Sequence, residues 1–265
     1  MKTDTQDDVV IVEHDGHVAT VVLNRPQALN AINSRMKALF PRVLQELDDD
    51  PSVRAIVITG AGTRGFCAGA DIKDFADPES SLQARKRLLQ AGFAGALDRF
   101  SKPSIAAVHG HCLGGGLEMA MACDLRVAAH NTQLALPEIN LGLIPGAGGT
   151  QRLPRLVGLG RALELLLTGD RIGAEDALRM GLVNKVVGPE RDVRAEAVAM
   201  AQRIAQKPPA AAAAVKEAAR VGSTLDLATG LRLEKDLFAM LLATEDKLEA
   251  AMAFKEKRTP RFTGR

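Results

Sequence analysis

The chain has 265 residues, 46% of them hydrophobic, and its 34 basic side chains nearly balance 32 acidic ones, for a formal charge of +2. This length and composition suit a globular protein with one large core, and the balanced charge gives no reason to expect a nucleic-acid partner. No apolar run approaches the roughly 20 residues of a membrane span, and the polar, acidic start shows no targeting segment. We therefore expect a cytoplasmic protein without a membrane partner.

Two β-branched runs at the start of the chain, Val9 to Glu13 and Val18 to Leu23, flank the pair Asp15-Gly16. An Asp-Gly pair between such runs is a strong hairpin signal, so the chain is predicted to open with two antiparallel strands. An apolar stripe at helical spacing begins after Asn33-Ser34, which can cap a helix. Pro41 lies inside this stripe, so a kink or a later start of the helix stays open.

The middle of the chain alternates between strands of a buried type and helices. Strands are predicted over Ala55 to Thr59 and Ser104 to Val108, with a polar helix around Ser81 to Phe100 between them. Strands and helices that alternate at this spacing imply parallel pairing through crossovers. Residues 1–190 are therefore predicted to form an α/β core.

After about residue 190 the sequence becomes rich in Ala, Lys and Glu. Composition and period predict helices over Ala210 to Arg220, Leu225 to Leu242 and Glu245 to Lys257. Pro208-Pro209 and Gly222 separate these helices. Residues 191–265 are therefore predicted to form a helical region that packs on the α/β core or is exchanged between copies of it.

The three cysteines, Cys67, Cys112 and Cys123, are an odd number in a long chain, which favours reduced, buried thiols over a disulfide framework. Cys112 also follows His109 and His111 in a dense cluster. Alternation along a strand places the two histidines on one face, but no third or fourth ligand stands nearby at the spacing of a metal site. We therefore expect no metal.

Two glycine-rich segments can be compared with nucleotide-binding loops. Gly60 to Gly65 matches G-x-G-x-x-G directly after a strand, but no helix opens at once and the region about 20 residues onward is basic rather than acidic. Gly142 to Arg155 lacks the Gly-Lys-Ser/Thr ending of a phosphate loop. A dinucleotide site and a nucleotide triphosphatase are both disfavoured.

Small residues in two other loops suit the binding of an oxyanion. In Ala68 to Lys73, a backbone without bulk can approach a carbonyl and present N–H groups to it, although Asp71 as an ordinary helix cap explains the same residue types. In His109 to Glu118, three successive glycines precede a helix expected over Leu117 to Cys123. The positive end of that helix would favour a bound oxyanion.

Two glutamates accompany these loops. Glu118 falls in the first turn of the expected helix, and Glu138 follows Pro137, where a further helix can begin. A carboxylate near the start of a helix is favoured by the helix dipole alone, so a purely structural role stays open. Each glutamate also stands beside a glycine-rich loop that can present N–H donors.

Taken in this order, the segments resemble the crotonase, or enoyl-CoA hydratase/isomerase, family over nearly the whole chain. The motifs are A-G-A-D-I-K, L-G-G-G-x-E and P-E-I-x-L-G-x-x-P-G-x-G-G-T-Q-R-L, whose order and spacing are too specific for chance. Members of the family fold as a spiral of β-β-α turns followed by a helical trimerisation region, and many assemble as dimers of trimers. The resemblance implies this α/β fold and a homotrimer or hexamer.

The site residues of the family can be carried over by motif. The resemblance implies oxyanion-hole N–H groups at Ala70 and Gly115, paired catalytic carboxylates at Glu118 and Glu138, and a water-positioning role for Gly146. This set implies hydration of a 2-enoyl-CoA to a 3-hydroxyacyl-CoA, with Glu118 taking a proton from water and Glu138 giving one to Cα. CoA enters as part of the acyl-CoA thioester substrate, and no cofactor is required.

The resemblance also implies contacts with CoA. Backbone groups of Ala28, Ala68 and Ile72 would bind CoA, and the cations Arg64 and Lys73 would lie near its phosphates. Phe254 and Lys257 would contact the CoA of a neighbouring subunit. Gln27 stands where several hydratases carry a basic residue, and Leu134-Ala135 replaces the common Phe-Gly in the floor of the acyl pocket. These departures leave part of the phosphate recognition and the acyl-chain preference open.

Other functions stay open on the sequence alone. A double-bond isomerase needs one base, whereas the presence of both Glu118 and Glu138 favours hydration. Dehalogenation, decarboxylation and thioester hydrolysis usually move or replace one of these acids. A non-catalytic RNA-binding or scaffold member is the alternative from a different class, and the near-neutral charge and the intact acids count against it.

Overall fold

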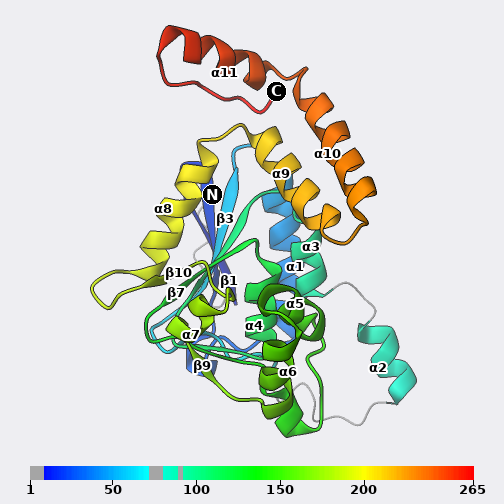
Figure 1. The fold of residues 1–265 in the computed structure, drawn as a ribbon. Helices are drawn as coiled ribbons and strands as arrows, with labels where there is room; N and C mark the ends of the chain where they lie inside the picture. Colours follow the sequence, from blue (N-terminus) through cyan, green and yellow to red (C-terminus); the bar gives the residue numbers. More distant parts are fainter. Residues whose placement is uncertain (1–8, 72–79, 89–91) are drawn as a thin grey trace.

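The computed structural model describes residues 9–71, 80–88 and 92–265, without the side chains of residues 87 and 88. Its α/β body contains two sheets (Figure 1). The larger has the order β1 (Val10–Asp15), β2 (Val18–Leu23), β3 (Ala55–Gly60), β5 (Ser104–Val108), β7 (Leu125–Ala129) and β10 (Lys185–Val187). All of its neighbours pair in parallel except β1 with β2. The smaller has the order β4 (Gly65–Cys67), β6 (His111–Leu113), β8 (Gln133–Ala135) and β9 (Ile172–Gly173).

The chain alternates between the two sheets. The pairs β3 and β4, β5 and β6, and β7 and β8 each place one strand in each sheet, and helices follow each pair. These are α2 (Ser81–Leu88) and α3 (Phe93–Arg99), then α4 (Gly115–Ala122), then η3 (Pro137–Leu141), α5 (Gly149–Val157) and α6 (Leu159–Thr168), with α7 (Ala174–Arg179) before β10. The repeated β-β-α turn confirms the predicted crotonase-type spiral.

Several local predictions are confirmed. The opening hairpin turns at Gly16, whose φ of +57° suits glycine. Helix α1 (Ser34–Asp49) begins after Asn33, whose side chain accepts a hydrogen bond from the N–H of Met36. Pro41 lies within α1 without ending it, so the helix does not start late.

Two predicted helices differ from the structure. The single helix expected around Ser81 to Phe100 is wrong, because α3 begins afresh after Gly92, whose backbone is extended with φ −83° and ψ −170°. The helix expected over Leu117 to Cys123 starts two residues earlier, as α4 from Gly115. The short residues of its first turn thus belong to the helix itself rather than to a loop before it.

The central strands of the larger sheet, β2, β3 and β5, are buried on both faces. Strand β3 shows the alternation of side chains: Ile56 and Ile58 pack with the cluster that includes α1 and α4, whereas Ala55 and Val57 pack against α8 (Val193–Ala205). A strand covered on both faces reads as a continuous apolar run, which is what the sequence has here. The sheet therefore holds the ends of its strands, and the loops that follow them, in fixed positions.

The last part of the chain is helical, as predicted. Helix α8 packs on the larger sheet, and α9 (Pro209–Gly222) packs beside α10 (Leu227–Leu241). Figure 1 shows α10 and α11 (Glu245–Glu256) reaching away from the α/β body. Among the described residues, no helix combines the length and the apolar character needed to cross a bilayer.

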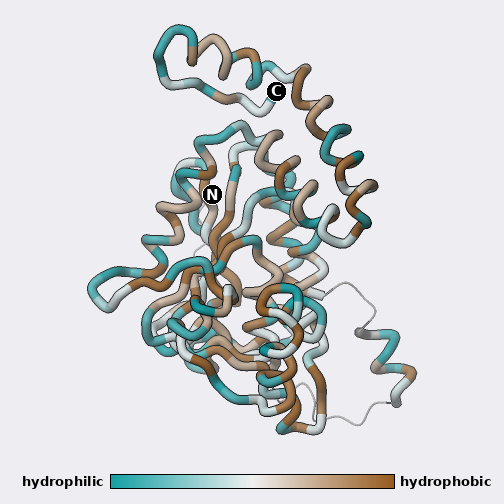
Figure 2. Tube along the Cα trace, in the orientation of Figure 1, coloured by the Kyte–Doolittle hydropathy of each residue, from teal (hydrophilic) through white to brown (hydrophobic). Residues whose placement is uncertain are grey.

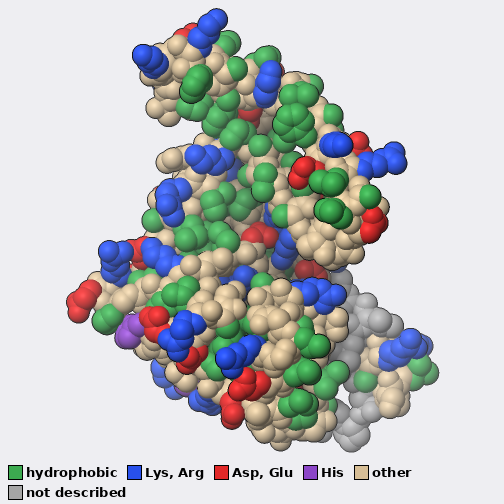
Figure 3. Space-filling view, in the orientation of Figure 1, with side chains coloured by type: hydrophobic (Ala, Val, Ile, Leu, Met, Phe, Trp, Pro, Cys, Tyr) green, Lys and Arg blue, Asp and Glu red, His purple; other side chains and the backbone are tan. Residues whose placement is uncertain are grey.

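Helices α9, α10 and α11 expose large apolar side chains. Figure 2 shows hydrophobic stretches along them, and Figure 3 shows hydrophobic side chains on their surface. We call this set the apolar face of the helical region: Val215, Val221, Leu225, Leu227, Leu231, Phe238, Met240, Leu242, Leu248, Met252 and Phe254. The described chain leaves this face without a covering element.

Candidate active site

Two backbone N–H groups meet where α4 begins. A Cβ built on Gly115 would lie 3.6 Å from the Ala70 nitrogen, so the two backbones are adjacent. Ala70 is held there because Ile32 bonds the residues on either side of it: the N–H of Ile32 donates to the Gly69 carbonyl, and the N–H of Asp71 donates to the Ile32 carbonyl. Within the described chain neither the Ala70 nor the Gly115 N–H donates a hydrogen bond. Both remain for a bound oxygen at the positive end of α4.

Glu118 lies in the first turn of α4 and is only 3% exposed. Its Oε1 accepts hydrogen bonds from the N–H groups of Ala147, at 2.7 Å, and Gly149, at 2.8 Å. Burial raises the pKa of Glu118, while these two hydrogen bonds and the charge of Arg152 act to lower it. The carboxyl group is therefore held in one orientation, and its Oε2 has no partner in the described chain.

Glu138 lies in η3, and its carboxyl group rests against the start of α4. A Cβ on Gly114 would lie 2.9 Å from Oε1 of Glu138, so the carboxyl group and this backbone are adjacent, and the φ of +50° at Gly114 favours glycine. Oε2 of Glu138 is buried and has no partner among the described residues. Burial and the nearby charge of Glu118 raise the pKa of Glu138 to about 7.

The fold thus brings together Ala70, Gly115, Glu118 and Glu138, which the sequence had put forward as one site. The arrangement offers N–H donors for a developing negative charge, a carboxylate fixed by hydrogen bonds, and a carboxyl group that can carry a proton near neutral pH. Gly146 is exposed and directly precedes Ala147, a partner of Glu118, so it also lies at this site.

Three of the residues expected to contact CoA lie together beside the loop that carries Ala70. Ala28 is in η1 (Pro26–Ala28), and the N–H of Ala68 donates to the carbonyl of Leu29, at 3.0 Å. Arg64 is exposed, and its guanidinium donates to the carbonyls of Pro26 and Gln27, at 2.8 and 3.1 Å. Arg64 therefore holds the η1 segment.

The other expected CoA contacts lie elsewhere. Ile72 and Lys73 fall outside the described residues. Phe254 and Lys257 are on or just after α11, which Figure 1 shows at the far end of the helical region from α4 and α5. Phe254 is 88% exposed. Within one chain, these two residues do not meet the glutamates.

Asn30 and Arg25 organise the η1 segment and were not singled out as site residues. Buried Asn30 accepts the N–H of Arg25 and donates to the carbonyls of Ala61 and Gly65. Arg25 also forms an ion pair with Asp71, with 2.9 Å between nitrogen and oxygen. Asn30 has a φ of +55°, a backbone region that asparagine tolerates better than most residues. The asparagine at this position was the only signal that the sequence offered.

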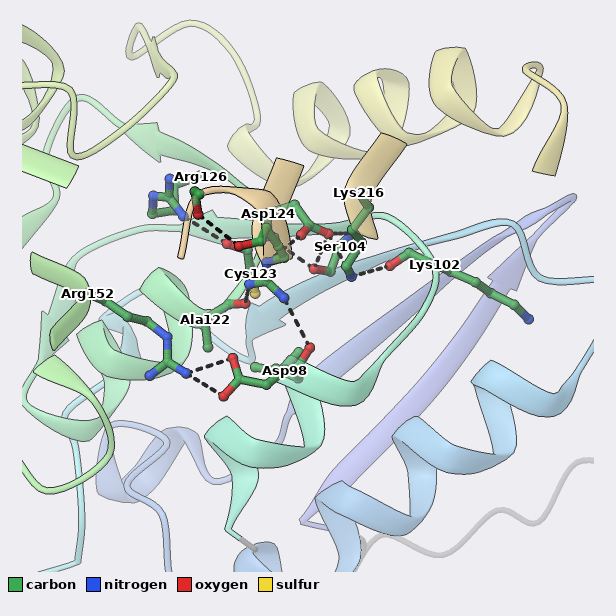
Figure 4. Close-up of polar contacts among 12 residues, drawn as sticks. Asp98, Lys102, Ser104, Ala122, Cys123, Asp124, Arg126, Arg152 and Lys216 are labelled. Atoms are coloured by element: carbon green, nitrogen blue, oxygen red, sulfur yellow. Dashed lines mark hydrogen bonds and ion pairs between the residues drawn. The ribbon is translucent and has the colours of Figure 1, made fainter. Parts of the chain in front are cut away.

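Arg152 was also missed. Figure 4 shows its guanidinium beside Asp98 of α3, and Nη2 lies 2.7 and 2.6 Å from the two carboxylate oxygens. Nη1 donates to the carbonyl of Ala147, at 2.8 Å. The only sequence signal was its place in the G-G-T-Q-R motif, because Asp98 stands 54 positions earlier.

The chain is similar to known proteins over nearly its whole length. The model of the enoyl-CoA hydratase/isomerase family matches residues 13–265. The chain is 44% identical over 250 residues to the short-chain-enoyl-CoA hydratase of Clostridium acetobutylicum, covering 94% of this chain and 95% of that protein. It is also 44% identical over 255 residues to the crotonyl-CoA hydratase of Syntrophomonas wolfei, covering 96% and 97%. The crystal structure of an enoyl-CoA hydratase from Bacillus anthracis has a TM-score of 0.91 and 39% identity, covering 97% of this chain and 100% of that one.

Proposed function

The chain belongs to the enoyl-CoA hydratase/isomerase family, and from that premise we propose that it is an enoyl-CoA hydratase. The enzyme adds water across the double bond of a 2-enoyl-CoA and forms a 3-hydroxyacyl-CoA. The observation that carries this proposal is the pair of carboxyl groups at the start of α4: Glu118, in its first turn, is held by two N–H groups, and Glu138 rests against Gly114 just before it.

The first part of the mechanism concerns the thioester carbonyl. When water attacks Cβ, the electron pair of the double bond moves toward the carbonyl oxygen, which becomes an enolate oxygen. In our proposal the N–H groups of Ala70 and Gly115 donate to this oxygen. One such donor is typically worth about 10²- to 10³-fold in rate, because it is already oriented before charge develops.

The second part concerns protons. The carboxylate of Glu118, held through Oε1 by two N–H groups, takes a proton from the attacking water through its other oxygen. The water oxygen bonds to Cβ, and protonated Glu138 delivers a proton to Cα. Glu118 gains one proton and Glu138 loses one. Transfer of one proton from Glu118 to Glu138, through solvent, restores the starting state of both groups. Gly146 would help to hold the water.

The substrate class follows from the relatives. Two similar proteins are named for short-chain and crotonyl substrates, and we propose a short 2-enoyl-CoA for this enzyme as well. Its CoA moiety would contact Ala28, Arg64, Ala68, Ile72 and Lys73. No further cofactor takes part in the proposed reaction.

We propose that the enzyme works as a homotrimer or as a dimer of trimers. The apolar face of the helical region supports this, since monomeric proteins rarely leave so many large apolar side chains uncovered. In such an assembly Phe254 and Lys257 would contact the CoA held by a neighbouring subunit.

The proposed setting is fatty-acid β-oxidation in the cytoplasm. The cysteines Cys67, Cys112 and Cys123 are free thiols, which suits a reducing compartment. Degradation of branched amino acids and of aromatic compounds uses similar reactions. The values of kcat/KM for a panel of short, long, branched and ring-derived 2-enoyl-CoA substrates will show which of these pathways the enzyme suits.

The decisive experiment follows the solvent oxygen. In ¹⁸O-labelled water, crotonyl-CoA should be converted reversibly to a 3-hydroxyacyl-CoA that carries the label, because hydration forms a C–O bond. The rival isomerase would only move protons between carbons. If the enzyme converts 3-enoyl-CoA rapidly to 2-enoyl-CoA but incorporates no label from any 2-enoyl substrate, the isomerase assignment replaces the hydratase one.

A further inference from the structure

The turn of residues 147–149, whose N–H groups bind Glu118, also accepts a hydrogen bond from Arg152. Ala147 donates its N–H to Oε1 of Glu118, and its carbonyl accepts a hydrogen bond from Nη1 of Arg152, at 2.8 Å. A Cβ on Gly148 would lie 1.8 Å from the same Nη1, so the backbone of the turn and the guanidinium occupy one tightly shared space. The orientation of Ala147 therefore depends on where Arg152 lies.

Besides the Ala147 carbonyl, the guanidinium of Arg152 contacts Asp98, whose side chain is half exposed. Both carboxylate oxygens of Asp98 accept from Nη2 of Arg152, and the Arg152 side chain is 21% exposed. The helix that carries Asp98 also contacts α9, because Arg220 donates to the carbonyl of Leu97, at 3.4 Å. Leu97 is fully buried. Asp98 thus presents its carboxylate from a helix that packs into the core through Leu97.

We infer that Arg152, oriented by Asp98, is a positioning residue for Glu118: it shapes the turn of residues 147–149 so that two N–H groups meet Oε1, and it keeps a positive charge beside the carboxylate. The inference deepens the proposed hydratase function and rests on it. Arg152 acts through Glu118 and the turn, not on the substrate. Its charge lowers the pKa of Glu118, against the larger effect of burial.

Two charged groups act on the Glu118 carboxylate from the elements around it, Arg152 from α5 and Glu138 from η3. Of the other charged or titratable side chains on elements packed against α4, Arg99 of α3, Arg155 of α5 and His111 of β6 are not among the groups that shift the pKa of Glu118. Asp98 of α3 binds Arg152, and buried Arg126 of β7 donates to the carbonyls of Ala120, Cys123 and Leu182. Removing Arg152 would leave Glu118 facing only the acidic Glu138.

The test compares four variants: Arg152→Gln, Arg152→Lys, Asp98→Asn and the control Arg155→Gln. Arg155 is one turn along the same helix, is exposed, and among the described residues donates only to Gln151. For Arg152→Gln we expect kcat to fall about 10²-fold with KM changed less than about threefold, since a small displacement of a catalytic group costs that much. The control should keep the wild-type kcat.

The pH profile separates positioning from general damage. Because Glu118 must be ionised to accept a proton, loss of the Arg152 charge should move the acidic limb of kcat to higher pH. Arg152→Lys keeps the charge, so its acidic limb should stay near that of the wild type and kcat should recover at least tenfold relative to the glutamine variant. Asp98→Asn should lower kcat about tenfold, because it weakens the ion pair that orients Arg152.

The outcomes distinguish this inference from the function on which it rests. A wild-type enzyme that incorporates no ¹⁸O label overturns the hydratase proposal. A wild type that hydrates normally, while Arg152→Gln and Asp98→Asn match Arg155→Gln in kcat and acidic limb, overturns the positioning role. Should Arg152→Gln fail to fold by circular dichroism, Asp98→Asn, which keeps the size of the side chain, decides alone.

Discussion

Glu118 and Glu138 have the same side chain but different surroundings. Glu118 is almost fully buried, and two N–H groups and a nearby arginine offset part of the effect of burial on its pKa. Glu138 has a carboxylate oxygen without a hydrogen-bond partner in the described chain, and the negative charge of Glu118 adds to the effect of burial on its pKa. Two carboxyl groups whose surroundings push their pKa values apart can serve as base and acid.

The pKa of Glu138 predicts an alkaline limit on activity. With a pKa of about 7, Glu138 is protonated below neutrality and loses its proton above it, so kcat/KM should fall by about tenfold per pH unit above about pH 7. Glu138→Gln should abolish this limb and lower kcat by about 10²-fold or more, because the amide cannot deliver a proton. Steady-state hydration rates between pH 5 and 9, together with CoA binding by calorimetry, measure both effects.

Glu118→Gln provides the companion measurement. It should also lower kcat by about 10²-fold, and the remaining alkaline limb should move to lower pH because the charge that raises the pKa of Glu138 is gone. Exposed Glu190→Gln is the matched control and should behave as the wild type. An unchanged kcat in either catalytic-site variant, or a flat wild-type profile up to pH 9, would contradict this division of roles.

Helix α4 has a defined function at each end. Its N-terminus presents the Gly115 N–H and carries Glu118, as described above. At its C-terminus, cationic side chains donate to carbonyls that have no donor within the helix: Arg126 to Ala120 and Cys123, and Arg220 to Ala122. Positive charge at this end complements the helix dipole. The helix that positions the site is thereby fixed to both the sheet and α9.

The residue that joins α9 to this end of α4 is Asp124. Its carboxylate pairs with Lys216 at 2.9 Å and with Arg220 at 3.3 Å, and it accepts both the N–H and the hydroxyl of Ser104. The Lys216 side chain is only 9% exposed, and burial lowers its pKa while Asp124 raises it. Figure 4 shows this cluster.

We predict that Asp124→Asn lowers the free energy of unfolding by about 2 kcal/mol, because it leaves the largely buried Lys216 without its counter-charge. Denaturant unfolding measures the change, and hydrogen exchange should show the loss concentrated in α9. Exposed Asp170→Asn is the control and should change the free energy by less than about 0.5 kcal/mol. Equal effects in the two variants would show that the ion pair contributes nothing to stability.

At the scale of the whole molecule, the apolar face of the helical region predicts self-association. We expect sedimentation at micromolar concentration to give about 84 kDa, three times the 28.1 kDa chain, or twice that value. Leu227→Glu with Leu231→Glu should dissociate the assembly, since the two residues are 77% and 46% exposed in one chain and would be buried by a partner.

A control for the assembly experiment is available on α8. Arg203→Glu changes the charge of an exposed side chain outside the apolar face and should leave the mass unchanged. Activity is the second measurement, because Phe254 and Lys257 would reach CoA only from another subunit. A wild-type monomer with full hydratase activity would contradict both the assembly and the shared CoA site.

Much of the fold and the centre of the candidate site could be predicted from short stretches of sequence. The Asp15-Gly16 turn, the Asn33 cap and the alternation of strands and helices depend on local conformational preferences, which act between neighbouring residues. Glu118 and Glu138 were identified by their places in the motifs of the family that the sequence resembles, and each stands beside a glycine-rich segment.

Only the tertiary structure decided which distant side chains meet. Asp98 and Arg152 are 54 positions apart, and Arg25 and Asp71 are 46 positions apart, so no local pattern links either pair. The register of the parallel strands and the layering of helices on the sheet bring them together. The break between α2 and α3 depends likewise on the backbone at Gly92, for which the apolar pattern of the chain carried no sign. Local preference thus determined the elements, the motifs of the resemblance identified the two glutamates, and long-range packing determined how those glutamates are held.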